Sequence, residues 1–421
     1  MQRISIPYHT GFLIADIPEE KLLGIFSARE VDPGATGVPV VEKALNEPYG
    51  TPGLAALSQG KQRVLVITSD HTRPMPSRLT MPLLLAEVRK GSPEAEIVIL
   101  IATGAHRATT TQELASKFGE AIVEKERIEI HDAYNEQNLI SLGRLKSGGE
   151  LTVHRRVAWA DLVVAEGFIE PHFFAGFSGG RKSILPGIAG AKTILENHCA
   201  AFIACPYART GVLENNPIHT EMVMAARMAK LAFVLNVVLN EEKQVFAAFA
   251  GDMESAHLAG CDYVKRHVGI RVPKAEIVIT SNGGYPMDQN IYQVVKGATA
   301  GEACVKEGGV IILCAACQDG HGGEGFISLL QNAPSPKALF ESIVAVGREN
   351  TQTDQWQAQL LARVLMHATV ILVSGCNKRL VESLHMRHAD SLEQAISMSY
   401  KMYPHGKIAV IPDGVNAIIE K

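Results

Sequence analysis

The sequence of 421 residues has no run of about 18 apolar residues, so we expect no transmembrane helix. Its first residues, Met1 to Pro7, lack the apolar segment of a secretory signal peptide. The seven cysteines are few and odd in number for a chain of this length, which suits a reducing compartment better than a disulfide framework. We therefore expect a cytoplasmic protein without membrane contacts.

A strong excess of one charge is also missing. The chain has 40 Lys and Arg against 44 Asp and Glu, which gives a net charge of −4. A nucleic-acid surface needs clustered Lys and Arg, so nucleic acid is not expected as a partner. A chain of 421 residues with 47% hydrophobic and 20% charged residues is an ordinary globular protein that is too long for one core. We expect at least two domains.

Two nucleotide-binding motifs are absent. The spacing of a P-loop, counted from Gly176, needs a glycine immediately before Lys182 and Ser183, and Arg181 stands there. No Gly-x-Gly-x-x-Gly follows the first expected strand, and an acidic ribose-binding residue about 20 positions further on cannot be placed. The sequence therefore excludes a P-loop and speaks against a dinucleotide-binding fingerprint.

Short apolar runs rich in β-branched residues alternate with stretches of helical spacing. We expect strands at residues 63–68, 96–102, 161–165, 275–280, 309–313, 369–373 and 407–411. We expect helices at residues 79–89, 111–118, 253–268, 352–366 and 391–402. This alternation predicts an α/β fold of two α/β domains with mostly parallel sheets. A junction near residues 266–274 predicts an N-terminal domain of residues 1–268 and a C-terminal domain of residues 269–421.

Polar residues come after four of the expected strands. They occupy residues 69–74, 103–107, 170–172 and 281–290. In open α/β sheets, ligands bind in the crevice at the carboxyl ends of the strands. Because the four groups come from both halves of the chain, we predict one active site in a cleft between the two domains.

The segment from Pro171 to His198 combines two histidines with a glycine-flanked lysine, Lys182. Glycines let backbone N–H groups approach an anion, and a lysine there can neutralise a phosphate or act as an amine nucleophile. His172 could carry a proton and His198 could bind a metal, although either histidine could equally serve packing or capping alone. Arg73 suits a carboxylate ligand.

Two further features have plain structural readings. Cys314 and Cys317 have the spacing of a redox or metal pair, but no second pair matches them, and the apolar run before them favours the buried end of a strand. Residues 319–325 form a glycine-rich segment, which we interpret as a flexible loop that could border the cleft.

Taken together, the motifs resemble those of the nickel-pincer lactate racemases and related 2-hydroxyacid racemases. The resemblance rests on Asp70–Pro74, Gly104–Arg107, Glu170–Gly187, Asn197–His198, Tyr292–Gln293, Lys296–Gly297 and Trp356–Gln357. These motifs run in order through both expected domains. The resemblance implies a racemase, an isomerase that inverts C2 of a 2-hydroxy acid.

The resemblance also implies a cofactor, a pyridinium mononucleotide with two sulfur-containing arms that hold nickel in a planar pincer. It implies covalent attachment to Lys182 and nickel ligation by His198, and planar sulfur, carbon and imidazole donors suit Ni(II) better than a tetrahedral zinc site would. Ser178, Gly179 and Gly180 would contact the nucleotide phosphate. The enzymes that build the cofactor would be transient partners.

Within this family pattern, Asp70 belongs to the cofactor side of the site and would orient neighbours such as Arg73. The chemistry that the resemblance implies is reversible hydride transfer from C2, with His106 and His172 as the paired acid and base for the hydroxyl proton. Arg73 and Lys296 would hold the carboxylate. Gln293 lies three residues before Lys296 on an expected helix and hence on the same face.

Tyr292 and Trp356 would wall the pocket, together with Phe173 and Phe174. A second carboxylate would lie unpaired among these aromatic residues, so lactate or a short-chain analogue is the expected substrate. Malate, phenyllactate or a sugar acid is the alternative within the family. A pyridine-nucleotide dehydrogenase for 2-hydroxy acids and a binding protein without turnover are the alternatives outside it.

Overall fold

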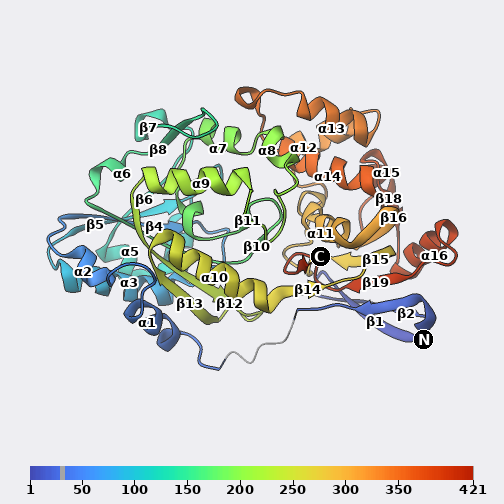
Figure 1. Ribbon diagram of the computed structural model, residues 1–421, viewed down its shortest axis with the longest axis horizontal. Coiled ribbons are helices and arrows are strands. Elements are labelled where there is room, and N and C mark those ends of the chain that lie inside the picture. The colour runs from blue at the N-terminus through green and yellow to red at the C-terminus, as the bar shows by residue number, and fades with distance from the viewer. Residues whose placement is uncertain (29–33, 421) are drawn as a thin grey trace. The chain divides into compact units, whose positions relative to one another are not determined.

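The computed structural model describes residues 1–28 and 34–420 (Figure 1). Contacts between Cα atoms divide the chain into two compact units. Unit 1 comprises Met1–Glu30, His198–Pro206 and Lys265–Lys421, and unit 2 comprises Val31–Asn197 and Tyr207–Val264. The predicted division between residues 268 and 269 cuts the chain once, whereas the contacts group both ends of the chain in unit 1.

Unit 2 is built on a six-stranded sheet of order β13-β12-β9-β4-β5-β6. Its strands are β4 (Arg63–Ser69), β5 (Glu96–Ala102), β6 (Arg127–Ile130), β9 (Leu162–Phe168), β12 (Leu231–Leu239) and β13 (Val245–Gly251). Neighbouring strands are parallel except β13, which runs antiparallel to β12. The middle of β4 is buried throughout, as expected for a parallel strand with both faces covered.

Helices and small hairpins complete unit 2. The helices are α1 (Val38–Asn46), α2 (Leu54–Ser58), α3 (Ser77–Gly91), α4 (Thr111–Phe118), α5 (Glu120–Lys125), α6 (Arg156–Trp159), α7 (Ala191–Asn197), α9 (Pro217–Met228) and α10 (Met253–Val268). The short antiparallel pairs are β7 (Leu139–Arg144) with β8 (Glu150–His154), and β10 (Pro171–His172) with β11 (Gly176–Phe177).

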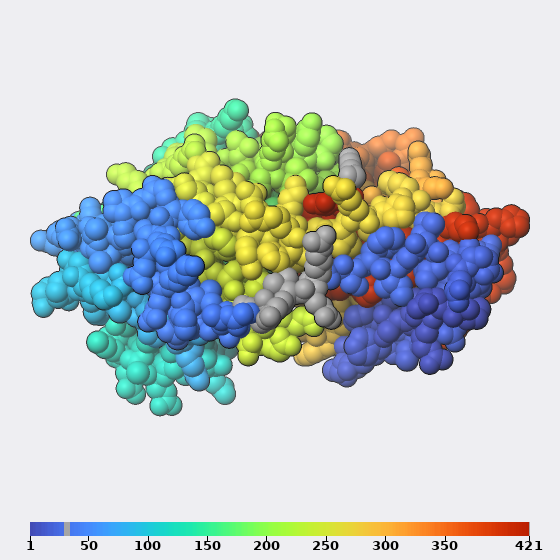
Figure 2. Space-filling model, turned by 60° about the horizontal axis from the view of Figure 1, so that its bottom comes forward, coloured from blue at the N-terminus to red at the C-terminus, as the bar shows by residue number. Residues whose placement is uncertain are grey.

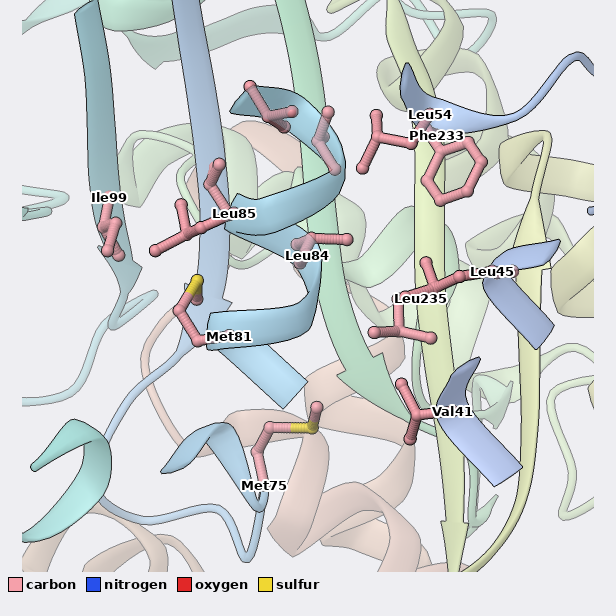
Figure 3. Close-up of a cluster of buried hydrophobic side chains, with 14 of the residues drawn as sticks. Val41, Leu45, Leu54, Met75, Met81, Leu84, Leu85, Ile99, Phe233 and Leu235 are labelled. Atoms are coloured by element: carbon pink, nitrogen blue, oxygen red, sulfur yellow. The ribbon is translucent and has the colours of Figure 1, made fainter. Parts of the chain in front are cut away.

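The core of unit 2 forms where helices meet this sheet (Figure 3). Met81, Leu84 and Leu85 of α3 recur at helical spacing, so they share one side of the helix and are all buried. They belong to one apolar cluster with Ile99 of β5 and Phe233 of β12. Burial of each such side chain stabilises the fold by about 1.5–3 kcal/mol, which fixes the strands whose ends carry the polar loops.

Unit 1 has a second six-stranded sheet, of order β18-β17-β16-β15-β19-β3, in which all neighbouring strands are parallel. Its strands are β3 (Leu22–Ile25), β15 (Ala275–Ser281), β16 (Val305–Cys314), β17 (Thr369–Val373), β18 (Arg387–Ala389) and β19 (Ile408–Ile411). A small parallel pair joins β14 (Gly269–Arg271) to β20 (Ile418–Glu420). The helices are α8 (Ala200–Ala204), α11 (Ile291–Cys304), α12 (Glu324–Gln331), α13 (Pro336–Val344), α14 (Gln355–His367), α15 (Lys378–Ser383) and α16 (Leu392–Met402).

The chain begins with an antiparallel hairpin of β1 (Gln2–Tyr8) and β2 (Gly11–Ile17). Ile4, Ile6, Ala15 and Ile17 point to one side and join the buried apolar cluster of unit 1. Figure 2 shows this hairpin in dark blue beside the red C-terminal residues, to which α16 belongs. The two ends of the chain therefore share one core.

The α/β prediction is confirmed, and each of the seven expected strands and five expected helices has a counterpart in the structure. The N-terminal hairpin and β12, an interior strand of the unit 2 sheet, were not predicted from the sequence. Within the two stretches that the structure describes, none of the helices is long and apolar enough to cross a membrane.

Candidate active site

Three of the predicted site residues lie at one edge of the unit 2 sheet. Asp70 follows β4, His106 follows β5 and His172 follows β9. These strands are neighbours and parallel, so their carboxyl ends lie side by side. After β4, the next parallel strand β5 lies on one side of it and β9 lies on the other, so the strand order reverses at β4. Open α/β sheets bind ligands at the carboxyl ends of the strands where the order reverses.

Asp70 and His106 form a buried carboxylate–imidazole pair. Asp70 is only 1% exposed, and its Oδ2 lies 2.7 Å from His106 Nδ1. Its Oδ1 accepts hydrogen bonds from the backbone N–H and the hydroxyl of Thr72, at 3.0 and 2.6 Å. Burial raises the pKa of Asp70, but the hydrogen bonds from His106 and Thr72 outweigh it and lower the pKa below its usual value. Asp70 therefore stays ionised at neutral pH.

The ionised carboxylate fixes the protonation of the His106 ring. A carboxylate only accepts hydrogen bonds, so Nδ1 of His106 carries the proton and Nε2 of the neutral ring keeps its lone pair. The His106 side chain is 46% exposed, which leaves it accessible to a ligand. The neighbour that the Asp70 side chain orients is thus His106, rather than Arg73 as the sequence suggested.

His172 has the opposite arrangement. The backbone N–H of Ala175 donates to His172 Nδ1 at 3.3 Å, so the proton of the neutral ring is on Nε2. Phe173 stacks on the imidazole at 5.1 Å between ring centroids, and Phe174 meets it edge-on at 4.5 Å. One histidine at this edge therefore presents a proton acceptor at Nε2, and the other presents a proton donor.

The glycine-rich loop before Lys182 is held by a buried cation. Arg181 is fully buried and donates to the carbonyl oxygens of Ala175 and Ser178, at 2.8 and 3.3 Å. It also contacts Nδ1 of His219 at 3.1 Å and Nε2 of His257 at 2.9 Å. Burial lowers the pKa of Arg181 to about 10, a value at which the guanidinium still carries its charge at neutral pH.

Burial beside Arg181 keeps His219 and His257 neutral. Burial, followed by the charge of Arg181, lowers the pKa of His219 to about 3 and that of His257 well below its usual value. His219 Nδ1 can therefore accept a hydrogen bond from the guanidinium, whereas His257 Nε2 lies 2.9 Å from the guanidinium and also 2.9 Å from the carbonyl oxygen of Ser178. From the sequence, Arg181 was only an obstacle to a P-loop, because His219 and His257 lie far along the chain.

The polar groups of the glycine-rich loop before Lys182 form hydrogen bonds within the protein. The Ser178 hydroxyl donates to the carbonyl of Phe168 and accepts from the N–H of Glu170, both at 2.9 Å, and the N–H of Gly180 donates to Asn236 Oδ1 at 2.9 Å. Gly179 and Gly180 have φ angles of +77° and +53°. A Cβ on Gly180 would lie 2.7 Å from the His257 ring. The fold of the loop therefore uses the Ser178 and Gly180 donors that the sequence analysis assigned to a phosphate.

The loop with His106 and the segment with Lys182 are joined. Gly104 N–H donates to the carbonyl of Gly187 at 2.9 Å, and Lys182 N–H donates to Gly179 at 3.1 Å, within a short 3-10 helix of residues 180–183. Lys182 is partly exposed at this point. Helix α7 ends at Asn197, and His198 lies in the turn that follows.

Two arginines near the histidine loops have different surroundings. Arg107 binds Glu113 through both guanidinium nitrogens, at 2.9 and 2.5 Å. These bonds, followed by the N–H of Thr110, lower the pKa of Glu113 to about 2. Arg73 follows β4 and has an exposed side chain. Arg107 therefore supports the start of α4, whereas Arg73 is placed to meet a ligand.

In unit 1, three predicted residues share one face of α11. Asn290 caps this helix by accepting the Gln293 N–H at 3.0 Å. Tyr292, Gln293 and Lys296 are partly exposed, whereas the residues between them turn into the core. Among the described residues, the Gln293 side-chain oxygen is a buried acceptor without a hydrogen-bond partner. That oxygen is suited to accept a ligand hydroxyl.

His198 also lies in unit 1, against a chain of aromatic contacts. Its ring is 5.0 Å from that of Trp356, and Trp356 hydrogen-bonds the Tyr292 hydroxyl. Tyr292 in turn donates to Asp354 Oδ1 at 2.9 Å. Burial, followed by the charge of Asp354, raises the pKa of Tyr292, so the phenol stays neutral. The structure thus brings His198, Trp356 and Tyr292 together, and adds Asp354, which had no signal in the sequence.

The fold and the polar strand ends define a two-unit α/β protein equipped for acid–base chemistry at the carboxyl edge of a parallel sheet. The protein-family model of the lactate racemase N-terminal domain matches residues 8–211. The family model of the lactate racemase C-terminal domain matches residues 270–419. The chain is 51% identical over 425 residues to the lactate racemase of Thermoanaerobacterium thermosaccharolyticum, and 46% identical over 424 residues to that of Lactiplantibacillus plantarum. Both comparisons cover 100% of each chain.

Solved structures agree with this result. The lactate racemase apoprotein from T. thermosaccharolyticum matches with a TM-score of 0.96 at 51% identity, over 100% of both chains. A protein from Thermotoga maritima shares the fold, with a TM-score of 0.64 at 19% identity over 92% of this chain and 100% of its own. The chain belongs to the lactate racemase family, a family of isomerases.

Proposed function

We propose that this protein racemises lactate, or a similar short-chain 2-hydroxy acid, by reversible hydride transfer from C2. The observation that carries the proposal is the pair of histidines at the unit 2 sheet edge with complementary protonation, His106 as acceptor and His172 as donor. A hydroxyl that becomes a carbonyl must lose its proton, and the reverse step must return one. For one enantiomer His106 would be the base and His172 the acid, and for the other enantiomer the roles would be reversed after the two rings have exchanged their protonation states.

The residues that would hold the family's nickel-pincer nucleotide are Lys182 and His198. A partly exposed amine in a rigid loop suits covalent attachment, and an imidazole nitrogen suits Ni(II). In the part of the chain that the structure describes, no three His, Cys, Asp or Glu side chains gather to hold a metal ion. A pincer brings its own sulfur and carbon donors, so one imidazole fits its requirement. When bound, this group supplies the acceptor for the C2 hydride.

The remaining residues would position the substrate. Arg73 and Lys296 would hold its carboxylate, and Gln293, on the same face of α11 as Lys296, would contact the substrate beside them. Tyr292 and Trp356 would line the pocket. The Asp70 carboxylate would hold His106 in the protonation state that accepts the hydroxyl proton.

The surroundings of two further arginines support a small substrate. A second carboxylate, as in malate, would need another cation. Arg107 is bonded to Glu113, and Arg181 is fully buried among carbonyl groups and imidazoles. A monocarboxylate with a small apolar substituent therefore fits best.

Racemisation of C2-deuterated substrates tests the reaction and the substrate together. Single enantiomers of lactate, 2-hydroxybutyrate and malate, all labelled at C2, are incubated with cofactor-loaded protein, and optical purity and label are followed. We expect lactate or 2-hydroxybutyrate to racemise fastest, with the deuterium largely returned to C2. Rapid loss of label to solvent would contradict hydride transfer. Faster turnover of malate would contradict the proposed pocket.

Mass spectrometry tests the attachment residue. Protein produced together with the cofactor-building enzymes should carry nickel and an added mass on the peptide that contains Lys182. Protein from a host without that pathway should have the bare peptide and no racemase activity. The matched control is Lys192, another lysine of unit 2, whose peptide should stay unmodified in both samples. Full activity with an unmodified Lys182 would refute the assignment.

A further inference from the structure

Two cysteines of unit 1 lie opposite each other at the ends of neighbouring strands. In the parallel pair of β16 and β17, Cys314 is opposite Val373. The pairing continues past the strands, because Ala315 N–H donates to Val373 at 3.1 Å and Gly375 N–H donates to Ala316 at 3.3 Å. This register places Cys317 opposite Cys376. The Cys376 sulfur lies 3.4 Å from the carbonyl oxygen of Cys317.

The two thiols contact each other in unequal surroundings. Cys317 is 3% exposed and has a φ angle of +51°, a conformation that residues other than glycine rarely adopt. Cys376 is partly exposed. The Cys376 thiol donates to the Cys317 carbonyl oxygen, and the interaction between the two side chains lowers the pKa of Cys376 below the ordinary thiol value. The same interaction, followed by burial, raises the pKa of Cys317, and the nearby Asp288 adds to that effect.

We propose that Cys317 and Cys376 are a redox-active pair that closes to an intramolecular disulfide when the protein meets a hydroperoxide. The partly exposed Cys376 thiolate attacks the peroxide oxygen, which yields a sulfenic acid and a hydroxide or alkoxide ion. The Cys317 sulfur then attacks the sulfenic sulfur, the S–S bond forms, and water leaves. Two thiols are oxidised and one hydroperoxide is reduced. A dithiol reductant reverses the step by exchange.

The pair is connected to the helix that carries the proposed substrate residues. Cys317 N–H donates to the Asp288 carbonyl at 2.8 Å, and Ala316 N–H donates to the Asp288 carboxylate at 3.1 Å. Further along the same loop, the carbonyl of His321 accepts the Tyr292 N–H at 3.0 Å. Closure of the disulfide would tie Cys317, at one end of this loop, to Cys376, and the loop is hydrogen-bonded to the start of α11. We expect oxidation to raise KM for the 2-hydroxy acid, an effect that rests on the proposed function, whereas the disulfide itself does not.

Peptide mapping tests the disulfide directly. The reduced full chain is treated with hydrogen peroxide, unreacted thiols are alkylated, and the digest is compared with and without dithiothreitol. We expect a cross-link between the Cys317 and Cys376 peptides, with the loss of two hydrogens and recovery on reduction. It should vanish in Cys376→Ser and persist in Cys205→Ser, which replaces the other partly exposed cysteine. Cross-linking through Cys205, or conversion of Cys376 to sulfinic acid without a cross-link, would overturn the proposal.

The pH dependence of alkylation tests the contact without oxidation. In the wild-type protein, the rate at which iodoacetamide modifies Cys376 should be half-maximal at a pH below the ordinary thiol range of about 8–9. Cys317→Ala removes the interacting thiol and should shift this midpoint toward that range, whereas Cys317→Ser keeps a hydroxyl donor and should stay closer to wild type. Circular dichroism confirms that each variant is folded. An unchanged midpoint in folded Cys317→Ala would refute the pairing.

Discussion

Asp70→Asn should lower kcat for racemisation by roughly a thousandfold, the scale at which a catalytic histidine loses its correct protonation state. The geometry explains why so small a change has so large an effect. Oδ1 of Asp70 receives the backbone N–H of Thr72, and a backbone N–H can only donate. The asparagine must therefore keep its oxygen toward Thr72 and turn its NH₂ group toward His106. That group donates to Nδ1 of His106, so the proton of the neutral ring moves to Nε2. A protonated Nε2 cannot accept the hydroxyl proton of the substrate.

Double substitution separates this explanation from a general loss of structure. His106→Ala alone should cost at least a hundredfold, as expected for a lost acid–base group, and so should His172→Ala. If Asp70 acts through His106, the double variant with Asp70→Asn and His106→Ala should be no slower than His106→Ala alone. KM should change little, because Asp70 is placed to contact the histidine and not the substrate. A multiplicative loss in the double variant would contradict the pairing.

Lowering the pH from 7 to 4.5 should destabilise unit 2 by several kcal/mol. Burial holds the pKa of His154 at about 4 and that of His219 at about 3, and it also lowers the pKa values of His131 and His257. Unfolding returns each ring to a pKa near 6.5. Each histidine therefore stabilises the fold fully above about pH 6.5, and this contribution is lost as the pH falls toward the folded value.

The size of this effect follows from the separation of the two pKa values. At pH 4.5 an unfolded histidine is protonated, whereas His154 and His219 in the folded protein are still mostly neutral. At about 1.4 kcal/mol for each pH unit below 6.5, each of the two costs roughly 2–3 kcal/mol. Together they make a substantial part of the stability of an ordinary domain.

The two tryptophans allow unit 2 to be followed separately. Trp159 lies in unit 2 and Trp356 in unit 1. In Trp356→Phe, the fluorescence of Trp159 reports unfolding of unit 2 in guanidinium chloride, and its midpoint should fall clearly between pH 7 and pH 4.5. Trp159→Phe gives the matching signal from unit 1. A Trp159 midpoint that is the same at both pH values would show that the buried histidines are not held neutral.

The sequence predicts the parallel strands well because buried parallel strands are short, apolar and β-branched. Strand β12, Leu231–Leu239, escaped prediction for a physical reason: a continuous apolar run fits a buried helix as well as a strand. In the hairpin of β1 and β2, the alternation of apolar and polar residues that indicates a strand is visible only at isolated residues such as Ile4 and Ile6. Nothing local indicates that it packs with strands such as β15 and β16, more than 200 residues later in the chain, because that contact depends on the whole fold.

At the site, the sequence predicted which residue types stand at the strand ends but not their bonding. The strand order explains why Asp70, His106 and His172 lie at one edge. The protonation of each ring depends instead on a single neighbour, the carboxylate of Asp70 in one case and the N–H of Ala175 in the other. Such contacts depend on ångström-scale positions that periodicity and spacing do not encode.

The buried charge of Arg181 has a consequence for the order in which the protein matures. Its guanidinium can leave water without a large penalty only when the carbonyls of the loop and the rings of His219 and His257 replace its hydration. His219 comes from α9 and His257 from α10, so both helices must have folded before the loop is set. Lys182, the next residue, thus reaches its final position only in a finished unit 2. A modifying enzyme that recognises this lysine in place would act on folded protein and pass over nascent or damaged chains.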